Sequence, residues 1–241
     1  MMMKTGCIDL FRSLKELAFP RLCAGCGKTL AIGEHFVCPQ CIIGLSRVKP
    51  RDWTNNDRIC KWYEHPEVKR VAALVRYQRE TVEARIIHRL KYGRHWQLGI
   101  WMGELAAAEL QESGLFEGID VIIPIPLSRQ RRFHRGFNQA EMIARGMSQA
   151  AKLPVRTDVL QRTKNNESQT HFSTEERLHR AHNLFRLRST EGLSGKHIML
   201  VDDVMTTGVT MLGAILTLKA IPNIRITAFS WAWTRGKSQH T

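Results

Sequence analysis

The segment 198–210 constrains the fold of this chain more than any other stretch of the sequence. Its first four residues, 198–201, are apolar and predict a buried strand. Two adjacent carboxylates, Asp202 and Asp203, follow at the carboxyl end of that strand. A run of small and polar residues then leads into a helical pattern over 211–219. This order predicts an open α/β sheet, whose ligands bind at the carboxyl ends of the strands.

The turn between that strand and helix predicts a phosphate site. Main-chain N–H groups and the positive dipole of a helix N-terminus hold an anion without lysine, and Gly208 lets the backbone approach closely. Carboxylates accept hydrogen bonds from vicinal ribose hydroxyls or reach Mg²⁺ through water. We therefore expect a site for a sugar 5-phosphate with free 2- and 3-hydroxyls, with Asp202 and Asp203 as candidate catalytic residues. The expected ligand-binding residues are Asp202, Asp203, Val204, Met205, Thr206, Thr207, Gly208, Val209 and Thr210. The alternative is a strand–turn–helix with two solvated acids.

All thirteen positions of 198–210 resemble the loop that binds 5-phosphoribosyl 1-pyrophosphate (PRPP) in type I phosphoribosyltransferases. The resemblance is specific because it fixes apolar, acidic and small residues together. It implies PRPP as the ligand, with Mg²⁺ as its companion ion.

The charge of the chain favours polyanionic partners or phosphorylated substrates. In 241 residues, 36 Lys and Arg stand against 22 Asp and Glu, a net charge of +14. Nucleic acid and phosphorylated substrates suit such a balance, although basic surface loops produce it too. No apolar run approaches the roughly 18–20 residues of a membrane helix, and charged residues at 9, 12, 15 and 16 interrupt any signal-peptide core. We therefore expect a cytoplasmic protein, in which paired cysteines hold metal in preference to forming disulfides.

Two CxxC pairs near the start predict a structural zinc ribbon. Their spacing places four thiolates around one tetrahedral ion with no open position. The expected Zn²⁺ ligands are Cys23, Cys26, Cys38 and Cys41. Free or redox-active thiols are the alternative, and His35 is a less favoured substitute ligand. Cys7 and Cys60 fall outside the spacing and are interpreted as ordinary thiols.

The rest of the chain alternates strands with helices. We expect an N-terminal segment with zinc ribbon and connector over 1–62, and a phosphoribosyltransferase-like domain over 63–241. The expected helices are 82–92, 96–110, 136–152, 174–182 and 211–219; the expected strands are 119–126, one near 159, 185–187, 198–201 and 224–233. Alternation of this kind implies a mainly parallel sheet flanked by helices, with right-handed crossovers.

Two basic segments are candidates for binding pyrophosphate or nucleic-acid phosphate. An arginine-rich loop follows the first strand of the domain, and a polar segment over 160–183 has the composition of a closing flap. Guanidinium groups suit both kinds of phosphate. The candidate residues are Arg129, Arg131, Arg132, Arg135, Arg162 and Lys164. Solvated surface segments are the alternative for both.

Taken together, the ordered motifs resemble the ComF/GntX family. They are the four cysteines, Lys91-Tyr-Gly, Pro124-Ile-Pro-Leu, Arg135-Gly-Phe-Asn-Gln, Arg162 with Gln169 and Arg177 to Asn183, and Val201-Asp-Asp-Val-Met-Thr-Thr-Gly. The resemblance implies a type I phosphoribosyltransferase fold with a zinc ribbon. It also implies a role in natural competence, in which incoming single-stranded DNA is handled in the cytosol together with competence proteins. The amidophosphoribosyltransferase label that such proteins often carry needs an N-terminal nucleophilic cysteine, and this chain begins Met1-Met2-Met3, so we expect no glutamine-dependent activity.

Three functions remain open at this point. The first is a PRPP-binding competence protein that also holds single-stranded DNA by phosphate contacts and aromatic stacking. The second is an active phosphoribosyltransferase of nucleotide salvage or synthesis, although no base-specificity element is recognisable. The third is a PRPP sensor without turnover. Candidate stacking residues are Phe133, Phe137, Trp96, Trp101, Trp231 and Trp233, most of them expected in the core.

Overall fold

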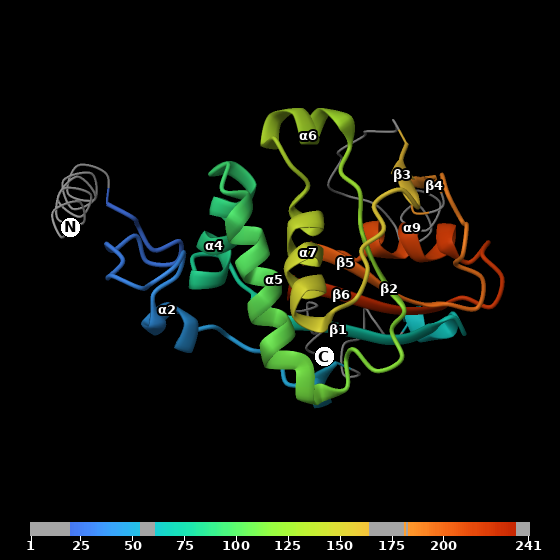
Figure 1. Ribbon diagram of the computed structural model, residues 1–241, viewed down its shortest axis with the longest axis horizontal. Helices are drawn as coiled ribbons and strands as arrows, with labels where there is room; N and C mark the ends of the chain where they lie inside the picture. The colour runs from blue at the N-terminus through green and yellow to red at the C-terminus, as the bar shows by residue number, and fades with distance from the viewer. Residues whose placement is uncertain (1–19, 54–60, 164–180, 182, 235–241) are drawn as a thin grey trace, which may run out of the picture.

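The computed structural model describes residues 20–53, 61–163, 181 and 183–234. Within these residues, four parallel strands form a sheet in the order β1 (Val68–Tyr77), β6 (Arg225–Thr234), β5 (His197–Met205) and β2 (Val121–Pro124). Helices cover it (Figure 1). The centres of these strands are continuously buried and mostly apolar, with Thr227 and Ser230 of β6 as buried polar exceptions, as expected of parallel strands covered on both faces. The predicted mainly parallel α/β sheet is confirmed.

Strand β5 extends beyond the predicted 198–201. It continues to Met205, which pairs with Trp233 of β6, so Asp202 lies inside the strand in register with Ser230. The acids therefore sit within the last ladder positions of the sheet, where the backbone is fixed. Strand β1 was not predicted. Its apolar core 71–75 joins the edge of the sheet beside β6, and residues 46–48 of the connector bond to its outer side.

Three helices gather beside one another: α4 (Val82–Tyr92), α5 (Trp96–Leu110) and α7 (Gln139–Ala151). The first two match their predicted bounds, and α7 is shorter than the predicted 136–152. Helices α5 and α7 touch backbone to backbone, because a Cβ added at Gly103 would overlap the carbonyl of Ile143, and one at Gly146 would overlap that of Ile100. Helix α9 (Val209–Leu218) lies apart from them and packs against β5 and β4 (Figure 1).

The arginine-rich segment after β2 is a helix, α6 (Arg129–Arg135), so its prediction as a loop was wrong. Ser128 caps its start by accepting a hydrogen bond from the Arg131 amide, and Gly136 ends it in the left-handed conformation (φ 81°). These two residues stop the helix after seven positions.

Strands β3 (Leu160–Arg162) and β4 (Phe185–Leu187) pair with each other in a separate antiparallel sheet. The predicted flap over 160–183 falls mostly outside the described residues, and so do Lys164 and all of the helix predicted over 174–182 except Ala181. Phe185 is buried and packs into the main core.

The N-terminal part of the described chain is a small ribbon. An antiparallel bridge joins Leu22 to Thr29, and α2 (Pro39–Ile43) begins directly after Cys38 and contains Cys41. Short 3₁₀ turns at Pro50–Asp52 (η1), Lys61–Glu64 (η2) and Gln111–Ser113 (η3) complete the elements. The Arg85 side chain of α4 bonds to the Gly25 carbonyl, so the ribbon is docked on the domain. The proposed division between residues 62 and 63 stays a prediction.

No helix in the described parts of the chain combines the length and apolar character that a membrane crossing requires.

Candidate functional site

The turn between β5 and α9 has the form expected of a phosphate site. Gly208 occupies the N-cap of α9 in the left-handed conformation (φ 80°, ψ −7°), while Thr206 and Thr207 are exposed. Among the described residues, no hydrogen bond is recorded from the amides of Thr207, Gly208 or Val209. An exposed turn with unpaired amides at a helix N-terminus is able to accept an anion.

The two acids are held by the main chain at the edge of the sheet. Asp202 Oδ1 accepts a hydrogen bond from the Asp203 amide, and Asp203 Oδ1 accepts one from the Val204 amide, each at 2.8 Å. Burial raises the pKa of Asp202 well above its usual value, and the neighbouring charge of Asp203 adds to the rise. The ionised form of such a carboxylate is stabilised when a cation or donor hydroxyl groups bind beside it.

Lys91 at the end of α4 belongs to the candidate site, although the residues predicted from the sequence did not include it. Its Nζ lies 3.0 Å from Asp203 Oδ2. Apart from this ion pair, that buried oxygen has no hydrogen-bond partner within the described residues, so it keeps a lone pair for a ligand hydroxyl. The Lys91-Tyr-Gly motif was the available signal, because it belongs to the ComF resemblance.

Some of the predicted arginines converge on this edge of the sheet. Burial lowers the pKa of Arg162, the nearby Arg131 lowers it further, and Asp202 acts in the opposite direction. Arg131 of α6 and Asp202 of β5 therefore both act electrostatically on Arg162 of β3. The Arg162 guanidinium also lies over the Phe185 ring at 5.5 Å. A half-buried cation with a second arginine and an acid in its electrostatic surroundings suits a pyrophosphate group.

The other predicted cations line the outside of the same edge. Arg129 and Arg132 are exposed on α6, and the neighbouring Phe133 is 86% exposed. Arg135 donates to Gln139 Oε1 at 3.0 Å and lies 5.8 Å from the centre of the Tyr92 ring. We call α6 together with Tyr92 the basic rim.

The candidate stacking aromatics divide into two groups. Trp231 and Trp233 are buried in β6, and Trp231 donates to the Met102 carbonyl at 3.1 Å, so their predicted packing role is confirmed. Phe133 and Trp96 are exposed, against the expectation of a core position. Trp101 and Phe137 are half-buried. Only exposed rings are available to stack on bases.

Asn138 stands at the N-cap of α7, as expected, but its side chain does not cap the helix. Its Nδ2 donates instead to the Ile125 carbonyl at 3.0 Å, which ties the end of β2 to the start of α7. The Asn138 Oδ1 is buried without a hydrogen-bond partner in the described structure.

The four predicted cysteines come together as one cluster. Their sulfur atoms all lie within 4.8 Å of one another, and the sulfurs of Cys26 and Cys38 are 3.8 Å apart, a spacing that fits tetrahedral coordination. Although burial by itself raises the pKa of Cys23, the amides of Cys38, Cys26 and Gly25 lower it to about 6. His35 lies outside the cluster, and Cys7 and Cys60 lie outside the described residues. The cluster is suited to a metal ion.

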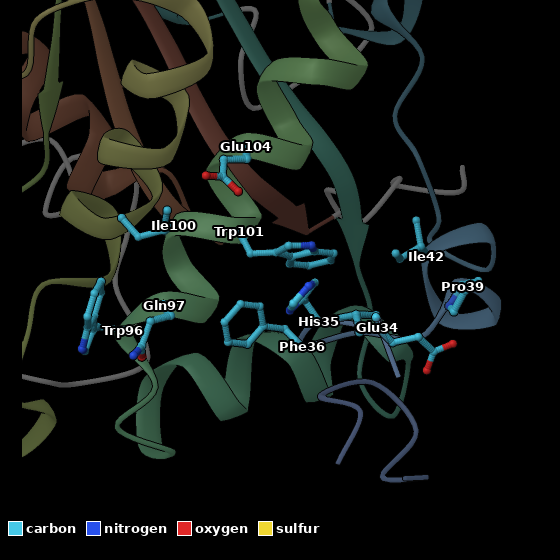
Figure 2. Close-up of a pocket in the computed structure, with 12 residues that line it drawn as sticks. Glu34, His35, Phe36, Pro39, Ile42, Trp96, Gln97, Ile100, Trp101 and Glu104 are labelled. Atoms are coloured by element: carbon cyan, nitrogen blue, oxygen red, sulfur yellow. The ribbon is translucent and has the colours of Figure 1, made fainter. Parts of the chain in front are cut away.

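The most prominent cavity lies between the ribbon and α5, away from the β5–α9 turn. Its volume is about 570 Å³, and Phe36, Trp101 and His35 face its centre (Figure 2). Glu34 and Glu104 are among its lining residues, so it is acidic and suits phosphate poorly. No residue of the turn or of the basic rim lines it.

Comparison with known proteins places this geometry in context. The family model described as "Phosphoribosyl transferase domain" matches residues 102–226. The DNA utilization protein YhgH of Escherichia coli O157:H7 is 27% identical over 210 residues, which cover 81% of this chain and 89% of that protein. Competence protein F of Haemophilus influenzae is 33% identical over 93 residues, covering 38% of this chain and 41% of that protein. A structure of glutamine PRPP amidotransferase from B. subtilis gives a TM-score of 0.39 at 16% identity, covering 56% of this chain and 26% of that one.

Proposed function

Because this chain belongs to the phosphoribosyl transferase domain family and, with the relatives named above, to the ComF family, we propose that it binds PRPP and handles incoming single-stranded DNA during DNA uptake. The observation that carries the proposal is the turn at Gly208, in which Thr206 and Thr207 are exposed and the unpaired amides come shortly after Asp202 and Asp203 in the chain. The amides of the turn would bind a phosphate, and the carboxylates near the end of β5 would accept hydrogen bonds from hydroxyl groups of the same ligand.

The chemistry of the proposed site divides between its three parts. The amides of Thr207 to Val209 would hold the 5-phosphate, and the two carboxylates would accept from the ribose hydroxyls. Arg162 and Arg131 would neutralise the pyrophosphate. Mg²⁺, when bound with PRPP, would supply further positive charge on the pyrophosphate. Lys91 would hold the Asp203 side chain in place through their ion pair.

The proposed role in DNA handling is supported by the basic rim and by the names of two relatives. YhgH is named a DNA utilization protein, and the Haemophilus relative a competence protein. Arg129, Arg132 and the exposed Phe133 on α6 combine phosphate contacts with a ring free to stack on a base. Their position on the same edge as the turn lets one surface respond to both ligands.

An active transferase is the second candidate. The electrostatic influence of both Arg131 and Asp202 on Arg162 favours it, since departure of pyrophosphate needs cations grouped near the acid pair. Pyrophosphate release from PRPP on addition of any of a panel of nucleobases would establish turnover. PRPP binding without turnover and without DNA retention would instead establish a sensor.

Replacement of both acids tests the proposed ligand. We expect Asp202→Asn with Asp203→Asn to abolish PRPP binding in calorimetry with Mg²⁺. The asparagine Oδ1 atoms still accept from the main-chain amides of residues 203 and 204, so only the carboxylate charge is lost. Asp120→Asn with Asp158→Asn is the matched control, with the same change of charge at two ion-paired acids outside the turn, one half-buried and one exposed. Equal PRPP affinity in the wild type and the first variant would refute the site.

Four cysteines at this spacing are proposed to hold one structural Zn²⁺, which would leave the ion no open coordination position. The proposal rests on the sulfur geometry given above.

A further inference from the structure

The turn at Gly208 rests on an indole ring that comes from a distant part of the chain. Trp62 of η2 is buried, and its six-membered ring touches Gly208 so closely that an added Cβ would overlap Cζ2 and lie 3.2 Å from Cη2. The Trp62 side chain thus fills the space in which any other residue at position 208 would place its Cβ. Glycine is required here both by its positive φ and by this contact.

The turn is held at a second point near its start. Thr234 Oγ1, at the end of β6, donates to the Thr206 carbonyl at 3.1 Å. The indole therefore contacts the end of the turn while the hydroxyl fixes its beginning. Between these two contacts the amides of Thr207 and Gly208 have no recorded hydrogen-bond acceptor in the described chain.

We propose that Trp62 is a positioning residue for the sugar-phosphate site. By packing against Gly208, the indole would fix the distance between the amides of the turn and the two acids. This inference rests on the proposed function. An anion held by several amides is sensitive to their placement, since in active sites a misplacement of about 1 Å is enough to cost about a hundredfold in rate.

The position of Trp62 in the chain gives the inference its specificity. It lies in the connector between the ribbon and β1, outside residues 102–226 that match the family model. The phosphate loop itself lies inside the matched region. The N-terminal part of this chain therefore contributes to a site whose other parts belong to the shared domain.

The test compares two buried tryptophans of the connector. Trp62→Ala and Trp62→Phe are set against Trp53→Ala and Trp53→Phe, because Trp53 is equally buried but donates to the Ala73 carbonyl of β1 at 3.2 Å. Ribose 5-phosphate is the probe, measured by calorimetry, with melting temperature as the measure of stability. We expect affinity to fall about tenfold or more in Trp62→Ala and less in Trp62→Phe, while the Trp53 variants lose stability and keep their affinity.

A double-variant cycle adds a readout that stability alone does not move. Gly208→Ala should weaken the wild type strongly through the overlap with the indole, and should weaken the Trp62→Ala variant less, so that the two effects are not additive. Additive effects, or unchanged affinity in a folded Trp62→Ala protein, would overturn the inference while ribose 5-phosphate still binds the wild type. A wild type that binds no sugar phosphate would overturn the proposed function and this inference together.

Discussion

At the scale of single residues, the site has an acid pair that is unfavourable until a ligand arrives. Asp202 is partly buried beside a second carboxylate, and Lys91 pairs with Asp203 alone. Two adjacent charges at the end of a strand cost stability in the free protein. Binding groups that are retained at such a cost are typical of functional sites.

Asp202→Asn should therefore stabilise the ligand-free protein at neutral pH. The folded-state pKa of Asp202 is raised above its unfolded value near 3.8. The contribution of Asp202 to the free energy of unfolding is thus most favourable below about pH 4, where the side chain is protonated in both states. That contribution is lost as pH rises through the folded-state pKa. Asparagine keeps the Oδ1 acceptor for the Asp203 amide, so the gain in melting temperature should be near zero at acid pH and grow towards pH 8.

Asp120→Asn is the control with the opposite sign. The His197 amide and Lys196 lower the pKa of Asp120 in the folded protein. Asp120 therefore stabilises the fold above the ordinary pKa of an aspartate, and this stabilisation is lost as pH falls through the lowered folded-state pKa. Thermal melts of both variants between pH 3 and 8 should diverge in opposite directions. A melting temperature of Asp202→Asn that is unchanged or lowered at neutral pH would contradict the account of the acid pair.

At the scale of elements, the sequence predicted those whose ends carry local signals. Helix α4 begins at Thr81, whose hydroxyl accepts from the Ala84 amide, and ends at Gly93, where a Cβ would meet the Arg89 carbonyl at 2.6 Å. Helix α6 was missed because its arginines carry no apolar periodicity. Strand β5 was drawn too short because the two acids interrupt its apolar run, although pairing with β6 continues past them.

The site was predictable where it is contiguous in sequence and not where it depends on packing. The strand, acids and turn of 198–210 are read from one segment. Lys91 and Trp62 reach the same place from helices more than a hundred residues away, and only tertiary contacts reveal them. The arginines were predicted by residue type, yet the sequence did not show that Arg131 and Asp202 both act electrostatically on Arg162.

Helix α6 should carry much of the affinity for single-stranded DNA. Replacing Arg129, Arg131 and Arg132 by alanine removes up to three phosphate contacts. The slope of log affinity against log salt concentration should then fall by about 2, since each contact to a single strand contributes about 0.7. Binding of a labelled oligonucleotide measured by anisotropy at several salt concentrations gives this slope.

The matched control removes three cations near the amino-terminal ends of the strands, Lys69, Lys196 and Arg225. All three are exposed, and the net charge changes by the same amount as in the α6 variant. Equal loss in both triple variants would mean that DNA responds to total charge and not to α6.

At the scale of the whole molecule, the ribbon and the sheet share one continuous core. Buried ribbon residues such as Val37 and Cys41 belong to the same apolar cluster as the sheet. Gly25 packs against Val82 of α4, where a Cβ would lie 2.9 Å from a valine methyl group. The ribbon is therefore not an independent appendage on a flexible linker.

Removal of the metal should disturb the ribbon before the sheet. We expect roughly one zinc per chain, measured by elemental analysis, because four thiolates complete a single tetrahedral site. A chelator should change the fluorescence of Trp101, which faces the cavity between ribbon and α5, while the circular dichroism of the sheet persists. A fully folded protein purified without metal would argue against the zinc site.

Helix α4 contacts both ends of this arrangement. Near its start Arg85 holds the Gly25 carbonyl beside the cysteine cluster, and near its end Lys91 holds Asp203. The two binding equilibria consequently share one rigid body. By thermodynamic reciprocity, whatever factor zinc applies to the affinity for a sugar phosphate, the sugar phosphate must apply to the affinity for zinc. If the cluster holds zinc and the turn holds a sugar phosphate, as proposed, loss of the metal would reach that ligand through α4.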